Sequence, residues 1–82
     1  MRQYSVKDLN VGMRVRREQL KDIYGVWIYF DNYISGEGGK IICISTVRDS
    51  AEVKEAVRNN GNIISMFYQD PDLCNDGVVI YD

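Results

Sequence analysis

The sequence predicts a small α+β domain that is mainly β, with five short antiparallel strands and one helix. Three observations lead to this prediction. Short apolar runs with a period of two recur along the chain, glycine-rich turns separate them, and a single segment has helical spacing. The 82 residues are expected to form one domain, 1–82.

The first strand is expected at about 11–17, because apolar residues alternate there with glycine and arginine. The next segment, Gln19 to Tyr24, has the spacing of one helical or 3₁₀ turn with its apolar side chains toward the core. Gly25 is expected to end this turn. The aromatic-rich run that follows predicts a second strand at about 26–32.

The glycine-dense segment from Tyr33 to Lys40 predicts a hairpin loop, followed by a third strand at about 40–47. A connection this short requires the two flanking strands to be antiparallel. The segment does not fit a phosphate-binding loop, because Ile34 stands where the first glycine is needed and a strand, not a helix, is expected next.

One helix is expected at about 49–60. Asp49 is the predicted N-cap with Glu52 three residues later, and Asn60-Gly61 is a stop signal. Two further strands complete the set, at about 62–69 and 77–81.

Five short strands in so small a chain must curve or be covered on one face, because a flat open sheet leaves edges and apolar surface exposed. The favoured architecture is a small SH3-like barrel or bent sheet with the helix inserted between its third and fourth strands. The alternative is an open α+β sheet with the helix on one face.

Composition argues against an enzyme and against a bound cofactor or metal. Histidine is absent, which removes the commonest general base, the Ser-His and Cys-His nucleophile pairs and most zinc sites. The two cysteines, Cys43 and Cys74, are expected to be free thiols, the first buried in an apolar run. The segment around Pro71 lacks the glutamate that closes a calcium loop. Its carboxylates form a second, acidic candidate surface: Asp70, Asp72 and Asp76.

The charge is unevenly placed along the chain. The segment up to Tyr24 contains six basic and three acidic residues, and the rest of the chain contains four basic and nine acidic residues. The net charge is −2. The basic first strand followed by an aromatic strand is typical of a contact surface. The candidate binding residues are Arg14, Arg16, Arg17, Trp27 and Tyr29.

The sequence does not decide which face of the strand at 26–32 is buried. If Val26, Ile28 and Phe30 point inward, Trp27 and Tyr29 are expected to stand exposed near the arginines; alternatively, Trp27 packs beneath the helix.

Residues 9–32 resemble small uncharacterised SH3-like domains of Firmicutes and their mobile elements. The resemblance is carried by a VGM-x-V strand at Val11 to Val15, a QL-x-x-IY turn from Gln19 to Tyr24, and the hydrophobic strand that follows. It implies no activity and no functional residue. A phage or plasmid origin implies an adaptor or an inhibitor that occludes a host protein.

These observations together predict a cytoplasmic, non-enzymatic domain that binds another protein, because no leader and no membrane-spanning run is visible. The alternative is a nucleic-acid-binding SH3-like barrel that uses the basic first strand. A homodimer formed by pairing edge strands is a further expectation.

Overall fold

The computed structural model describes residues 1–68 and 76–81, the latter by their backbone. In chain order the elements are two 3₁₀ turns, five strands and one helix: η1 (Val6–Asp8), β1 (Arg14–Val15), η2 (Arg17–Leu20), β2 (Val26–Ile34), β3 (Gly38–Ser45), α1 (Ala51–Asn60), β4 (Ile63–Tyr68) and β5 (Asp76–Tyr81).

The strands form one antiparallel sheet in the order β1-β3-β2-β4-β5. β3 and β4 both pair antiparallel with β2, so they run parallel to each other and α1 connects them across β2. Among the described residues no ladder joins β1 to β5. The closed barrel is therefore not confirmed, and the sheet is open with a helix on one face, as in the alternative. Buried clusters pack against both faces of the open sheet.

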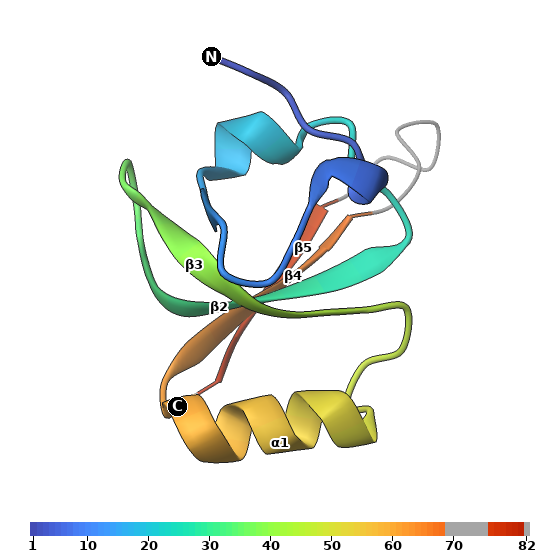
Figure 1. Ribbon diagram of the computed structural model, residues 1–82, viewed down its shortest axis with the longest axis vertical. Coiled ribbons are helices and arrows are strands. Elements are labelled where there is room, and N and C mark those ends of the chain that lie inside the picture. Colours follow the sequence, from blue (N-terminus) through green and yellow to red (C-terminus); the bar gives the residue numbers. More distant parts are fainter. Residues whose placement is uncertain (69–75, 82) are drawn as a thin grey trace.

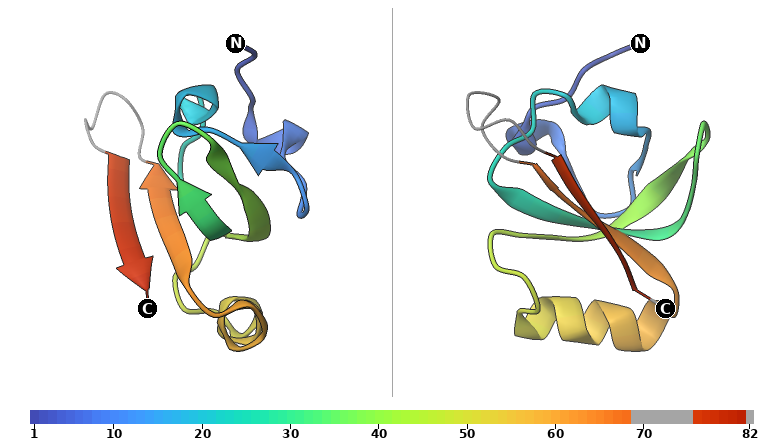
Figure 2. Two further views of the ribbon diagram at one scale, coloured as in Figure 1. Left: turned by 90° about the vertical axis from the view of Figure 1, so that its left-hand side faces the viewer. Right: turned by 180° about the vertical axis from the view of Figure 1, so that it is seen from behind.

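The sheet lies between two layers. α1 runs below it, and the N-terminal segment with η1 and η2 lies above it (Figure 1); the side views show the same arrangement (Figure 2). Side chains of β2 alternate between the layers. We call the cluster toward the N-terminal segment the N-terminal core, and it includes Val15, Leu20, Ile23, Val26, Ile28, Phe30 and Ile41. We call the cluster toward α1 the helix core, which consists of Tyr29, Cys43, Val53 and Ile63.

The first strand is much shorter than predicted. Gly12 has φ +97°, and the Met13 N–H donates to the Asn10 carbonyl at 3.2 Å, so the chain turns here. Val11 is 66% exposed at this turn. The strand therefore covers only Arg14–Val15, and the prediction of a strand over 11–17 is wrong outside these two residues.

The helix begins at Ala51, two residues later than predicted, and its N-cap lies one residue later than predicted. Ser50 is the N-cap, and its hydroxyl accepts the backbone N–H of Val53 at 3.3 Å. Asp49 lies outside the helix with φ +59° and is not the cap. The predicted stop is confirmed, because Gly61 has φ +70° and its N–H donates to the Val57 carbonyl at 3.2 Å.

The predicted hairpin between β2 and β3 is confirmed, with a shorter loop than expected because the strands extend to Ile34 and from Gly38. Gly38 has φ +80°, and a Cβ atom there would overlap the carbonyl oxygen of Val15. Only glycine allows β3 to start this close to β1. In the part of the chain that is described, no helix is both long and apolar enough to cross a membrane.

Candidate binding surfaces

The predicted arginines and aromatic residues do not meet. Arg14 pairs with Lys40 near the start of β3, whereas Trp27 pairs with Ser45 at its end. Ser45 lies five positions after Lys40 along β3, which corresponds to roughly 17 Å. The single surface expected from the sequence is therefore divided into a basic part and an aromatic part.

Tyr29 belongs to the core. It is 0% exposed and lies in the helix core with Val53 of α1. Its ladder partners are Cys43 on β3 and Ser65 on β4, both buried. Because α1 crosses over β2, the side chain points under the helix, and it supports the fold rather than a contact with a partner.

Trp27 lies on the same face of β2 as Tyr29 but is only half-buried, at the edge of the helix core. It pairs across the ladder with Phe67 of β4, which is also half-buried. The two rings stack in a tilted arrangement, with centroids 4.6 Å apart and planes at 31°. The guanidinium of Arg48 lies over the Trp27 ring, 5.5 Å from its centroid. We call Trp27, Phe67 and Arg48 the aromatic surface.

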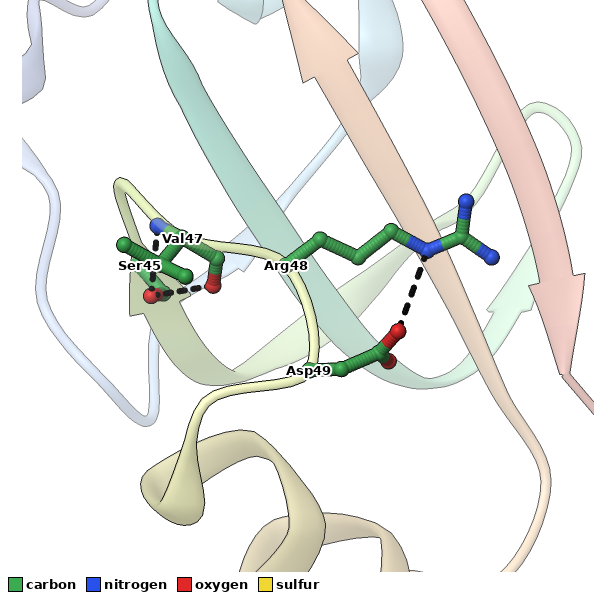
Figure 3. Close-up of polar contacts among 4 residues, drawn as sticks. All are labelled: Ser45, Val47, Arg48 and Asp49. Atoms are coloured by element: carbon green, nitrogen blue, oxygen red, sulfur yellow. Dashed lines mark hydrogen bonds and ion pairs between the residues drawn. The ribbon is translucent and has the colours of Figure 1, made fainter.

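The segment that carries Arg48 is fixed by a compact turn. The hydroxyl of Ser45 accepts the N–H of Val47 at 3.0 Å and donates to the Val47 carbonyl at 2.7 Å (Figure 3). The Nε of Arg48 lies 3.5 Å from Oδ2 of Asp49. Both side chains are about half exposed, so this ion pair contributes little to stability. The Arg48 side chain is extended, with its Nε facing the Asp49 carboxylate (Figure 3).

An open hollow lies beside this turn. Two of its hydroxyls already serve the local fold, since Ser45 closes the turn and Ser50 caps α1. The hollow is therefore lined in part by side chains that the local fold already uses. Its lining residues are Ile44, Ser45, Thr46, Val47, Ser50, Ala51 and Glu52.

A second surface lies at the other end of β3. Backbone contacts hold η2 in place here: the Arg16 N–H donates to Oε1 of Gln19 at 2.9 Å, and the Arg17 N–H donates to the Tyr33 hydroxyl at 2.7 Å. Burial raises the pKa of Tyr33, so its hydroxyl stays protonated at neutral pH. We call the exposed cations around this point the basic surface, namely Arg14, Arg16, Arg17, Lys21 and Lys40.

Of the remaining predicted groups, the structure describes Cys43 and the backbone of Asp76. Cys43 is buried and free, and burial raises the pKa of its thiol, which makes it a poor nucleophile. No group of three or more possible metal ligands occurs within residues 1–68 and 76–81. Of the predicted acidic surface, Asp70 and Asp72 lie outside the described residues, as does Cys74, and Asp76 is described only as the first residue of β5.

Sequence reasoning missed two residues of the aromatic surface, Arg48 and Phe67. For Phe67 the reason lies in the sheet. Nothing in its local sequence marks it, because its position beside Trp27 depends on β4 pairing with β2. Comparison of the chain with protein-family models, with curated proteins and with solved structures finds no match.

Proposed function

We propose that this chain is a non-enzymatic protein-binding domain and that the aromatic surface is its contact site. The proposed role is that of an adaptor or an inhibitor in the bacterial cytoplasm. The gene belongs to the bacterium or to a mobile element. The proposal also includes an SH3-like character of the curved sheet. The observation that carries it is the partly exposed Trp27–Phe67 stack beneath Arg48.

Residue chemistry supports this choice of surface. Tryptophan and arginine dominate the hot spots of protein interfaces, where truncation of one side chain typically costs about 2 kcal/mol or more. That cost corresponds to a loss of affinity of roughly 30-fold. Tyr29 and Val53 lie within the helix core, whereas Trp27 and Phe67 are only partly buried and so remain partly accessible to a partner.

The residues around the aromatic surface are held in fixed positions, which favours a preformed site. Trp27 and Phe67 lie on neighbouring central strands, and the turn that carries Arg48 is closed by two hydrogen bonds at Ser45. A surface that is already ordered loses little conformational entropy on binding.

The test is capture of a partner from native-host lysate by the immobilised domain, with and without nuclease, followed by mass spectrometry. Arg48→Glu reverses the charge over Trp27 and should abolish capture of the specific protein. Arg58→Glu is the matched control, because Arg58 is exposed on α1 away from the aromatic surface. Equal capture by wild type, Arg48→Glu and Arg58→Glu contradicts the site.

The alternative function is nucleic-acid binding through the basic surface. It is favoured by one observation: Arg14 lies directly opposite Lys40, and like charges in that position destabilise a sheet unless an anion neutralises them. Asp31 pairs with Lys40 on its other side and supplies part of that neutralisation within the chain. The net charge of −2 and the distance of Trp27 from these cations weigh against a stacking platform for bases.

A labelled single-stranded oligonucleotide at low salt tests this alternative by fluorescence anisotropy. Binding that weakens steeply with salt and that Arg16→Glu removes would support it. Absence of binding at low salt ends it.

A further inference from the structure

The two edges of the sheet differ in a way that bears on assembly. β1 is only two residues long and is bounded by the turn at Gly12 and by η2. A very short edge strand offers few backbone groups to another chain and is one of the ways in which proteins prevent edge pairing. β5 is six residues long. Within residues 1–68 and 76–81, it pairs with β4 on one side and with no strand on the other.

Among the described residues, the β5 strand lacks three features that commonly protect an edge strand, namely a bulge, a lysine and a proline. Its ladder with β4 runs without a register shift from Ile63–Tyr81 to Tyr68–Asp76, in contrast to the bulged β2–β3 ladder. The strand sequence, DGVVIY, contains no lysine and no proline, and three of its six residues are β-branched. Such a strand has high β propensity and a regular row of outward N–H and C=O groups.

We propose that β5 pairs antiparallel with β5 of a second copy of this chain, so that the two sheets become continuous. This inference is independent of the proposed function. A second copy is the favoured occupant because one strand then supplies both halves of the interface, as in isologous two-fold dimers. No complementary partner sequence is needed.

Symmetry limits the register. A two-fold axis perpendicular to an antiparallel pair passes through a position where one residue lies opposite itself. The longest overlap of two β5 strands is obtained when this residue is one of the two central residues, Val78 or Val79. The first register places Val79 of the second copy opposite Gly77, and the second places Tyr81 there. In both cases a large β-forming residue lies opposite a glycine, a combination that fits closely approaching strands.

The geometry also relates the dimer to the aromatic surface. Gly77 pairs with Phe67, which pairs with Trp27, so the β5 edge lies two strands from Trp27. An axis perpendicular to the sheet keeps both copies of α1, and both aromatic surfaces, on the same face of the joined sheet. The dimer is therefore suited to bind two equivalent sites on a symmetric partner.

The experiment is sedimentation velocity of the full chain over a range of concentrations. It compares the wild type with variants that carry a lysine or a glutamate at the residue that lies opposite itself. Wild type should sediment as a dimer. At the residue on the axis, a lysine or a glutamate lies opposite an identical charge, so Val79→Lys and Val79→Glu should each raise the dissociation constant at least tenfold. A mixture of the two variants should recover the dimer. Val78→Lys and Val78→Glu test the other register in the same way.

Val47→Lys is the matched control, because Val47 is 60% exposed in the β3–α1 connection and should leave the dimer unchanged. Hydrogen exchange on the unmodified chain gives an independent readout, in which β5 amides become more protected as the concentration rises. A monomeric wild type at all concentrations overturns the proposal. So does a dimer that neither charge pair weakens, or one whose β5 amides show no change in protection with concentration.

Discussion

Replacement of Gly38 by alanine tests how β1 is held against the sheet. Gly38 has φ +80°, a conformation that costs an L residue about 1–2 kcal/mol. The new Cβ would also overlap the Val15 carbonyl, so β1 has to move away by more than about an ångström before the contact is an ordinary one. That movement breaks the β1–β3 ladder and exposes Val15, which is 0% exposed and contributes roughly 1.5–3 kcal/mol by burial. We expect Gly38→Ala to lower the free energy of unfolding by about 3–5 kcal/mol.

The assay is urea denaturation followed by the fluorescence of Trp27. Gly36→Ala is the control, since Gly36 has φ +88° and no atom lies within 4 Å of an added Cβ. It should lose only the conformational part, about 1–2 kcal/mol. If the two variants lose the same stability, the close approach of β3 to β1 is not what requires glycine at position 38, and this reasoning is refuted.

Three further predictions follow from the caps, the titratable groups and the core. Ser50→Ala should cost about 1 kcal/mol because it removes the cap of α1, and an unchanged urea midpoint would contradict Ser50 as the cap. Hydrogen bonds from the backbone N–H and hydroxyl of Ser5 hold the pKa of Asp8 below its ordinary 3.8. A lowered pKa of a carboxyl group stabilises the fold above about pH 4, and this contribution is lost as the pH falls through the folded value, so Asp8→Asn should flatten the acid limb of the stability curve. Burial raises the pKa of the Cys43 thiol, so alkylation mapped to Cys43 should be slow in the native state and fast in urea, and rapid native labelling would contradict its burial.

Local signals in the sequence predicted the elements whose geometry is set by a few neighbouring residues. The Asn60-Gly61 stop and the glycine-rich hairpin are confirmed, because a left-handed backbone at Gly61 and a tight turn at Gly36 require glycine whatever the rest of the chain does. The prediction of a strand at residues 11–17 failed because a local turn signal there was overlooked. Val11 fits the alternation, but the left-handed Gly12 beside it makes a turn instead.

The strand order could not be read from local signals. β2 is the centre of the sheet because both β3 and β4 pair with it, and this depends on α1 crossing over β2. The crossing decides which aromatic residues are buried. It places Tyr29 beneath α1, leaves Trp27 at the edge of the helix, and brings Phe67 beside Trp27.

The candidate site was predicted in part. Trp27 and the arginines were identified by residue type, which reflects the chemistry of contact surfaces. Their separation into two surfaces follows from register, since Arg14 and Trp27 pair with opposite ends of β3. Arg48 was not singled out, because its position over Trp27 arises from the turn closed by Ser45.

The most direct test of the proposed contact site uses the single tryptophan of the chain as its own reporter. Labelling with 5-fluorotryptophan places one fluorine at Trp27, and its ¹⁹F resonance is recorded before and after addition of the captured partner protein. If the aromatic surface is the contact site, the resonance shifts and loses its sensitivity to the H₂O/D₂O ratio in the complex, and Arg48→Glu removes both changes at the same partner concentration. A partner that binds the domain while the Trp27 resonance and its solvent sensitivity stay unchanged would contradict the central claim.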